Sequence, residues 1–352
     1  MPKKNNENGR TTDMKAAVFY GKGDLRVEEA VTPVAGKGEI LVRVRACGVC
    51  GTDVHIFSGD EGAAKTTPPV ILGHEFAGEV EETGEGVAEF KKGDRVCVDP
   101  NVLCGECHYC KNALGHFCEH MQGIGTTVNG GFAEYVAVPA KQAYKLDDGT
   151  SFEEGAMTEP VACCLHGIDM CNIRPGDDVA VIGGGMIGLI MLQLARLKGA
   201  ARVVLIEPVK EKREKALSLG AYMTVDPVKE DVAAAIERAK TKRLSCVIEC
   251  VGLTSTIEQA IEIAGNAATV MMFGLTKPDA EIRVKPFTVF KKEIVLKSSF
   301  INPYTQGRAL NLINSKALDV SSMVANVVPL EKLKEVLSDA SMRAKGKFIV
   351  RP

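Results

Sequence analysis

One short segment of the sequence carries four closely spaced cysteines, Cys104, Cys107, Cys110 and Cys118. Four thiolates form the closed tetrahedral ligand set of structural zinc sites, which leaves no coordination position for a substrate. Disulfides are the alternative, but the first thirteen residues are polar and show no signal-peptide pattern. A cytoplasmic, reducing location is therefore expected, and there clustered cysteines more often hold metal. The spacing predicts a structural zinc site.

A second set of metal-binding residue types is dispersed along the chain. Cys50 lies in the segment GVCGTDVH, His74 and Glu75 are consecutive, and Glu159 comes much later. Thiolate, imidazole and carboxylate are all zinc ligands, and a catalytic zinc keeps one position open. Taken singly, Cys50 also fits a buried thiol, His74 a core histidine and Glu159 a carboxylate at a helix start. The spacing alone leaves open whether these residues share one metal.

The segment GGGMIG at residues 183–188 matches the dinucleotide-binding pattern GxGxxG. The first glycine permits a tight turn, the second lets the backbone approach a pyrophosphate, and the third allows a helix to pack closely on a strand. Free N–H groups at the start of that helix favour the anion. The predicted cofactor contacts come from Gly183, Gly185, Met186, Ile187 and Gly188.

Glu207 strengthens this interpretation because it ends the next expected strand, nineteen residues after Gly188. An acidic residue at this place binds the ribose hydroxyls of the adenosine and repels the 2′-phosphate of NADP, so NAD is favoured. NADP stays open because Lys210, Lys212 and Arg213 follow closely and could pair with a phosphate. Of these, Lys212 is counted among the expected cofactor-binding residues.

Two kinds of segment must position these residues. The first 150 residues contain short β-rich runs such as Ile40–Val44 and Phe132–Val138, and a final strand is expected at Lys347–Val350. After Pro175, strands alternate with helices, which predicts an α/β region with a parallel, doubly wound sheet. The expected elements there are strands Val179–Ile182, Val203–Glu207, Cys246–Glu249, Thr269–Phe273 and Ile294–Lys297, with helices Met186–Lys198 and Glu211–Leu219.

Composition restricts the possible partners. The chain has 352 residues, 45% apolar and 25% charged, with a formal net charge of -2. This length allows two domains, and this charge gives no reason to expect nucleic acid or a membrane as partner. The uncharged segment Val179–Ala195 is shorter than the roughly 20 residues of a membrane span and contains four glycines.

Taken together and in this order, the motifs resemble those of the zinc-containing medium-chain dehydrogenase/reductase family. The resemblance covers residues 14–352 and rests on GVCGTDVH, the GHE of Gly73–Glu75, the GDRV of Gly93–Val96, the four-cysteine segment and the glycine fingerprint. Within the family, the chain is most similar to sorbitol (polyol) dehydrogenases and to their butanediol and threonine dehydrogenase relatives. The pair Glu159–Pro160 resembles the polyol branch.

The resemblance implies the domain organisation. It places a GroES-like β-barrel catalytic domain at residues 14–165 and 305–352, and a Rossmann NAD-binding domain at residues 166–304. An active-site cleft is expected between them, and residues 1–13 are expected to form a disordered extension. Family members are commonly dimers or tetramers, so a homo-oligomer is expected.

The resemblance also implies the chemistry. Catalytic zinc is held by Cys50 and His74, with Glu75 and Glu159 as carboxylate neighbours, either of which could ligate it directly. A secondary alcohol bound there loses hydride to the nicotinamide of NAD and becomes a ketone. The hydroxyl of Thr52 receives the alcohol proton and the ribose hydroxyls pass it to His55, while Asp53 orients His74.

The substrate remains open among pentitols, hexitols, diols, amino alcohols such as threonine, and bulkier alcohols such as steroids. The segment at residues 299–304 lacks the arginine expected in animal sorbitol dehydrogenases, although Asn302 could bind a hydroxyl. Two other functions are weighed, a zinc-free reductase and a non-catalytic zinc-stabilised nucleotide-binding protein, and the intact metal-ligand residues disfavour both. Candidates for lining the substrate pocket are Ile56, Phe57, Ile124, Thr126 and Phe300.

Overall fold

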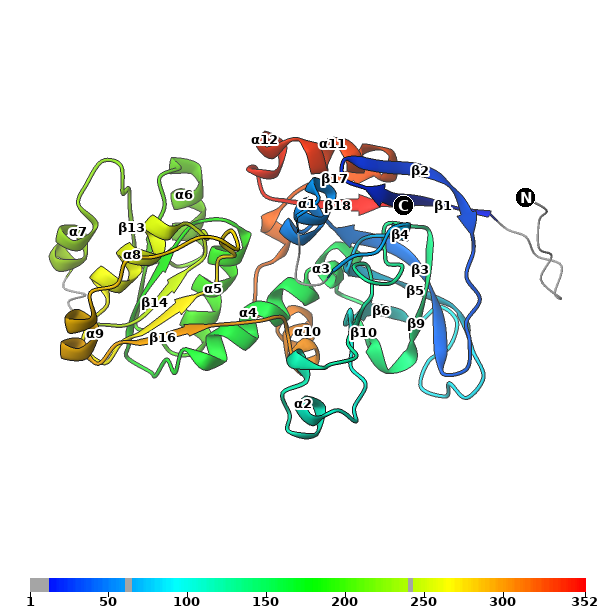
Figure 1. Ribbon diagram of the computed structural model, residues 1–352, viewed down its shortest axis with the longest axis horizontal. Coiled ribbons are helices and arrows are strands. Elements are labelled where there is room, and N and C mark those ends of the chain that lie inside the picture. Colours follow the sequence, from blue (N-terminus) through cyan, green and yellow to red (C-terminus); the bar gives the residue numbers. More distant parts are fainter. Residues whose placement is uncertain (1–12, 61–64, 240–242) are drawn as a thin grey trace. The chain divides into compact units, whose positions relative to one another are not determined.

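The computed structural model describes residues 13–60, 65–239 and 243–352, and the chain divides into two compact units (Figure 1). One unit consists of Met1–Glu159 and Gln306–Pro352, and the other of Pro160–Thr305. The extension expected at residues 1–13 lies outside the described residues except for Asp13, which begins strand β1 (Asp13–Gly21).

The first unit is built mainly of antiparallel strands. Its larger sheet has the order β10-β6-β5-β3-β18-β17, with β9 also paired to β3, and its smaller sheet has the order β2-β1-β4. The strands are β2 (Asp24–Val31), β3 (Glu39–Gly48), β4 (Val70–Ile71), β5 (Glu75–Thr83), β6 (Arg95–Val98), β7 (Asn101–Val102), β8 (Gln122–Gly123), β9 (Tyr135–Pro139), β10 (Ala143–Lys145), β17 (Val324–Pro329) and β18 (Lys347–Arg351). The strand predicted at Phe132–Val138 was wrong at its start, because pairing of β9 with β3 begins only at Tyr135.

Short helices join these strands. They are α1 (Gly51–Ser58), α2 (His108–Lys111), α3 (Phe152–Ala156), α10 (Gln306–Asn314), α11 (Leu333–Ser338) and α12 (Ala340–Arg343). The core of the unit is closed by apolar residues that are distant in sequence, such as Ile40, Phe76, Phe132 and Val350, all at most 1% exposed. Since β3 pairs with both β5 and β18, the last strand of the chain reaches the middle of the sheet.

The second unit contains a six-stranded parallel sheet in the order β13-β12-β11-β14-β15-β16. Its elements are α4 (Thr158–Met170), β11 (Asp178–Ile182), α5 (Met186–Leu197), β12 (Arg202–Ile206), α6 (Lys210–Ser218), β13 (Met223–Val225), α7 (Val232–Arg238), β14 (Leu244–Glu249), α8 (Thr254–Ile263), β15 (Thr269–Met272), α9 (Pro286–Lys292) and β16 (Val295–Ser298). The predicted strands and helices of this region are present, with ends that differ by one or two residues, and β13 is an addition.

The order of the strands creates a crevice at one end of this sheet. Every residue of β11 is buried, as expected for a central strand covered on both faces. Its neighbours β12 and β14 lie on opposite sides, so the direction of winding reverses between β11 and β14. Ligands of such sheets bind outside the carboxyl ends of the strands at this reversal. The segments that follow Ile182, Ile206 and Glu249 therefore surround the expected cofactor position.

In the part of the chain that the structure describes, no helix is both long enough and apolar enough to cross a membrane. The glycines within Val179–Ala195 mark a strand, a turn and a helix, which agrees with the interpretation of that segment from the sequence.

Candidate functional site

Cys50, His74 and Glu75 come together in the first unit. One ligand atom from each lies within 4.8 Å of the others. The fold explains this meeting, because β3 ends at Gly48 just before Cys50, and Gly48 is the register partner of Glu75 at the start of β5. Two neighbouring strand ends therefore present a thiol, an imidazole and a carboxylate to the same point.

Asp53 fixes the first two of these residues. It is fully buried; its Oδ2 accepts a hydrogen bond of 2.8 Å from the backbone N–H of Cys50, and its Oδ1 lies 3.4 Å from Nδ1 of His74. A metal-binding histidine usually turns its second nitrogen to such a carboxylate, which leaves Nε2 for the metal. Burial by itself lowers the pKa of His74, but Asp53 and the thiol of Cys50 outweigh it and raise that pKa well above its usual value.

The three side chains fit a zinc ion. Oε1 of Glu75 is buried and has no hydrogen-bond partner among the described residues, so it can accept a cation. Sulfur, nitrogen and oxygen donors at short mutual distance form a ligand set that zinc takes in catalytic sites. The anionic surroundings that raise the pKa of His74 also favour a bound cation.

Lys347 belongs to this centre, and the sequence analysis missed it. Its Nζ donates to Oε2 of Glu75, and both residues are buried, with exposures of 4% and 0%. A Cβ on Gly48 would lie 2.3 Å from Oε2 of Glu75 and 2.7 Å from Cε of Lys347, so only glycine leaves room for this pair. Burial lowers the pKa of Lys347, but the charge of Glu75 outweighs it and raises the pKa above its usual value. The available signal was a lysine directly before the apolar run Phe348–Val350 of the final strand.

The structure does not bring Glu159 into this group of ligand atoms. Glu159 is 8% exposed and lies in the first turn of α4, but the described groups of nearby metal-binding side chains do not include it.

Thr52 and His55 lie three residues apart on α1, and residues at this spacing share a helix face. The side chain of His55 is 43% exposed, and its Nδ1 lies 3.7 Å from Oδ2 of Asp60.

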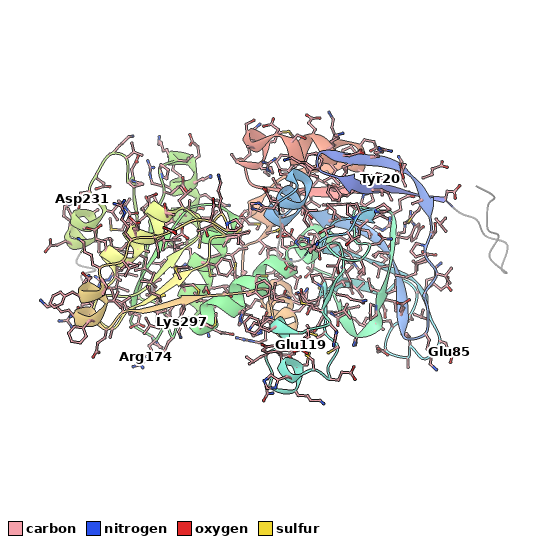
Figure 2. The ribbon with its side chains drawn as sticks, viewed as in Figure 1. Tyr20, Glu85, Glu119, Arg174, Asp231 and Lys297 are labelled. Carbon is pink, nitrogen blue, oxygen red and sulfur yellow. The ribbon has the colours of Figure 1, made fainter. Side chains whose placement is uncertain are left out.

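The four cysteines of the predicted structural zinc site also meet. Their sulfur atoms lie within 4.8 Å of one another, in a loop around α2 that projects from the strands of its unit in Figure 1. Backbone N–H groups point at the sulfurs, for example that of Cys107 at 3.4 Å from Sγ of Cys104. Such donors from Cys110 and from Glu119, which Figure 2 labels, lower the pKa of Cys107 to about 6. Burial and the neighbouring thiols instead raise the pKa of Cys110 to about 12. Since zinc binds thiolates, this loop fits a structural zinc.

The glycine fingerprint forms the turn between β11 and α5 in the second unit. Gly183 has φ +103, and a Cβ on Gly188 would lie 1.9 Å from the carbonyl oxygen of Gly183. Gly185 is the residue before α5 and is exposed, while Met186 and Ile187 begin the helix and are half-buried. The glycines therefore have the roles that the pattern assigns to them, a tight turn and a close helix.

Glu207 lies beside this turn. Its Oε2 accepts a hydrogen bond of 2.7 Å from the N–H of Gly184, and its Oε1 one of 2.9 Å from the N–H of Val209. The carboxylate is 5% exposed, and each oxygen keeps a second lone pair for a ribose hydroxyl. Lys212 is close, because a Cβ on Gly184 would lie 3.2 Å from that of Lys212.

Arg213, which could have bound a phosphate, is engaged elsewhere. Its Nη1 donates to the carbonyl oxygens of Glu207 and Pro208, both at 2.7 Å, and its Nη2 lies 3.1 Å from Oδ2 of Asp226. Its side chain is only 14% exposed. The guanidinium thus links the turn after β12 to the residue that follows β13. Asp226 was not anticipated from the sequence, which gave no sign that β13 would place it there.

The candidates for lining a substrate pocket divide into two groups. Ile56, Phe57 and Ile124 are buried members of the core of the first unit, which favours a packing role for them. Thr126 is half-buried and donates to the carbonyl oxygen of Gly123 at 3.2 Å, and Phe300 is 37% exposed. Asn302 is 1% exposed, with its Oδ1 3.9 Å from the thiol of Cys163.

Comparison with known proteins agrees with this geometry. The alcohol dehydrogenase GroES-like domain matches residues 36–148, and the zinc-binding dehydrogenase family matches residues 186–315. D-arabinitol dehydrogenase 1 of Uromyces fabae is 32% identical over 96% of this chain and 97% of its own length. (R,R)-butanediol dehydrogenase of Bacillus subtilis (strain 168) is also 32% identical, over 96% of this chain and 100% of its own.

A solved structure from Sinorhizobium meliloti 1021, assigned as a zinc-binding dehydrogenase and bound to NADP, is similar in both fold and sequence. It superposes with a TM-score of 0.93 at 38% identity, covering 97% of this chain and 100% of the other. The metal-binding residue groups, the glycine turn and these similarities over nearly the whole length lead to one conclusion. The chain belongs to the zinc-containing medium-chain dehydrogenase/reductase family, which includes polyol dehydrogenases.

Proposed function

We propose that this protein is a zinc-dependent, NAD-linked dehydrogenase that interconverts a secondary alcohol, such as a polyol or a diol, and its ketone. The observation that carries the proposal is the meeting of Cys50, His74 and Glu75 within 4.8 Å, in a chain that also has a complete dinucleotide fingerprint. The catalytic part is assigned to residues 14–165 and 305–352, and the NAD-binding part to residues 166–304.

Cys50, His74 and one carboxylate would hold the catalytic zinc. Bound zinc supplies Lewis-acid chemistry, because it lowers the pKa of an alcohol hydroxyl and polarises a carbonyl. Glu75 is favoured as the nearby carboxylate, since one of its oxygens lies within 4.8 Å of the ligand atoms of the other two residues. Lys347 donates to its Oε2, whereas its buried Oε1 has no hydrogen-bond partner among the described residues. Glu159, buried at the start of α4, is retained as the second carboxylate of the proposed site.

The proton released from the alcohol needs a route to solvent. The hydroxyl of Thr52 both accepts and donates a hydrogen bond, so it can receive the proton and pass it on. His55 lies on the same face of α1 and is partly exposed, so it can release the proton to water. Asp53 contributes indirectly, because it holds the backbone of Cys50 and the ring of His74 in place.

NAD is the proposed cofactor. Glu207 presents a buried carboxylate beside Gly184, where a 2′-phosphate would be repelled, and Arg213 is bound to carbonyl oxygens and to Asp226. Lys212, whose Cβ lies beside the same glycine, is proposed to contact the adenosine ribose. The NADP carried by the relative from Sinorhizobium meliloti makes the preference worth measuring directly.

The decisive experiment is a screen of NAD reduction by the zinc-loaded protein with pentitols, hexitols, vicinal diols, threonine and hydroxysteroids, repeated with NADP. Strong turnover of one class that a chelator abolishes is the expected result. Absence of turnover with every class, in protein that binds NADH and contains zinc, would contradict the proposal in favour of a nucleotide-binding protein without catalysis.

A homo-oligomer in the cytoplasm is also proposed. The twelve cysteines, all within the described part of the chain, form no disulfide there, which supports a reducing compartment. Phe287 and Phe290 on α9 are 71% and 78% exposed, and Val295 on the sheet-edge strand β16 is 47% exposed. Exposed apolar side chains beside a strand edge are typical of an interface, so light scattering after gel filtration is expected to give a dimer or tetramer.

A further inference from the structure

Glu249 ends β14 as a buried carboxylate that neither metal centre nor the glycine fingerprint uses. It is 0% exposed, and its Oε1 accepts hydrogen bonds from the N–H of Val251 (2.7 Å), the N–H of Gly252 (2.9 Å) and the hydroxyl of Thr256 (2.8 Å). Its Oε2 is also buried and has no hydrogen-bond partner among the residues the structure describes. Burying a carboxylate is costly, so an uncharged residue would fill this space better if packing were its only role.

Glu249 and its neighbour Cys250 connect three loops at one end of the parallel sheet. Its side chain holds the loop that follows β14, and its carbonyl oxygen accepts the N–H groups of Phe273 (2.9 Å) and Gly274 (3.0 Å) after β15. The next residue, Cys250, donates at 2.9 Å to the carbonyl oxygen of Ile182, which directly precedes the glycine turn. Glu249 therefore joins the loops after β14 and β15, and its neighbour Cys250 joins them to the loop after β11.

The backbones of two of these loops touch beside the carboxylate. Gly252 has φ +81, and a Cβ on it would lie 2.4 Å from the carbonyl oxygen of Leu275. A Cβ on Gly274 would lie 2.2 Å from the nitrogen of Gly252 and 2.8 Å from Oε2 of Glu249. Side chains are thus excluded here, which lets bare backbone face a ligand closely.

The strand order tells which part of the cofactor these loops would meet. Glu207, on the β12 side of β11, is assigned to the adenosine ribose, and the pyrophosphate to the start of α5. The two halves of a dinucleotide bind on opposite sides of the winding reversal, so the nicotinamide half falls on the β14 side. We infer that Glu249 is a positioning residue that shapes residues 250–253 and 273–275 into the seat of the nicotinamide half. This inference rests on the proposed function.

The test separates the two halves of the cofactor. NADH binding is measured by its fluorescence, and AMP binding by calorimetry as a probe of the adenosine half. Glu249→Ala is expected to weaken NADH binding about tenfold and to lower kcat, while AMP affinity stays within about twofold, because only one side of the crevice loses its hydrogen bonds. Glu249→Gln keeps a carbonyl oxygen for the three donors and is expected to restore most of the NADH affinity.

Asp178→Asn is the matched control. Asp178 is a buried carboxylate at the opposite end of the same sheet, bound to Arg202 by two hydrogen bonds of 2.7 Å. This variant is expected to be less stable than the wild type but to bind NADH with unchanged affinity. If Glu249→Ala does not fold, Thr256→Val is the alternative, because it removes a single hydrogen-bond donor. It is expected to weaken NADH binding two- to threefold and to leave AMP affinity unchanged.

The outcomes distinguish the two proposals. The positioning role would be overturned if Glu249→Ala weakened NADH and AMP binding equally. It would also be overturned if Glu249→Ala or Thr256→Val left NADH affinity unchanged, or if Glu249→Gln bound NADH as weakly as Glu249→Ala. A wild-type protein that binds no NADH would instead overturn the proposed function itself.

Discussion

At the scale of single residues, two buried carboxylates near the expected catalytic metal site each meet a specific partner. The carboxylate of Asp53 serves a backbone N–H and an imidazole, and that of Glu75 faces the cation of Lys347. Removing one partner of such a buried pair leaves an uncompensated charge, which is far more costly than losing a surface pair. Individual side chains at these positions therefore have large and specific effects.

Cys50→Ala is expected to reduce turnover at least about a thousandfold, because zinc stabilises the reacting oxygen by several kcal/mol and this variant loses a ligand. Zinc content should fall by about one ion per chain, while NADH affinity stays near that of the wild type. Metal analysis and kinetics on the same sample check this. Cys47→Ala, at a buried thiol outside the ligand group, is the control and should keep full activity. Full activity in Cys50→Ala would contradict the catalytic assignment.

Cofactor preference is the second residue-scale prediction. Glu207→Ala removes the carboxylate that repels a 2′-phosphate, and Asp226→Asn releases the Nη2 of Arg213 to bind one. Each change should reduce the preference for NAD over NADP, measured as the ratio of kcat/KM values, by about tenfold. Lys215→Ala, in the last turn of α6, should leave the ratio unchanged. If neither variant alters it, these residues do not set the preference.

At the scale of elements, the loop around α2 and helix α3 are held in place in different ways. The loop around α2 has little apolar core of its own, so bound metal is expected to hold its fold. Helix α3, in contrast, is fixed by a capping box between Ser151 and Glu154 and by the bidentate pairing of Glu154 with Lys316, both bonds being 2.8 Å.

Cys107→Ala should remove the structural zinc, while the variant that is still folded should keep its turnover. The protein is expected to lose about one zinc ion per chain and to unfold at lower temperature, because four thiolates together close the site. Calorimetry and metal analysis check this, with His120→Ala in the same loop as the control. Unchanged stability and zinc content would show that the loop does not need the metal.

The pair between Glu154 and Lys316 should appear in the pH dependence of stability. Burial raises the pKa of Glu154, but Lys316 and Ser151 outweigh it, and the pKa ends below its usual value of 4.5. A carboxyl with a lowered pKa stabilises the fold above its unfolded pKa, and this contribution is lost as the pH falls through the folded pKa.

Glu154→Gln keeps the capping box but removes the charge, so it should cost about 0.5–1 kcal/mol near neutral pH and progressively less below pH 4.5. Denaturant titrations at a series of pH values measure the difference. Lys316→Met should show the same convergence with wild type at low pH. A difference between wild type and Glu154→Gln that does not depend on pH would contradict the account.

At the scale of the whole molecule, the two kinds of site belong to different compact units. Both groups of metal-binding residues lie in the unit formed by Met1–Glu159 and Gln306–Pro352, and the glycine turn with Glu207 lies in Pro160–Thr305. Under the proposed function, turnover needs the sites of both units, whereas NADH binding depends mainly on the second unit. Metal removal should therefore separate the two activities.

Treatment with a mild chelator is expected to abolish turnover while NADH affinity changes less than about threefold, because the fingerprint contacts do not involve metal. Activity should return when zinc is added back. Fluorescence titration with NADH before and after chelation is the measurement, with far-UV circular dichroism to show that the fold persists. Loss of NADH binding together with activity would mean that the cofactor site depends on the metal.

The sequence by itself determined much of this protein. The spacing of Cys104, Cys107, Cys110 and Cys118 predicted a metal loop, because a short loop can bring ligands this close in sequence together without help from distant strands. The alternation of apolar runs predicted the parallel sheet, because buried strands and amphipathic helices have different periods. The glycine turn followed from local backbone geometry, which only glycine allows.

Only the tertiary structure decided which distant residues meet. Cys50, His74 and Glu75 were grouped by resemblance, and the pairing of β3 with β5 supplies the physical reason for their proximity. Lys347 reaches Glu75 because β18 pairs with β3 nearly three hundred residues later in the chain, and no local pattern encodes that register. Arg213 is not free to bind a phosphate, because Asp226 lies beside it. The pairing of β13 with β12 puts Asp226 there, and the sequence did not predict β13. Side-chain partners across a sheet are set by register and packing, and these emerge only when the whole chain folds.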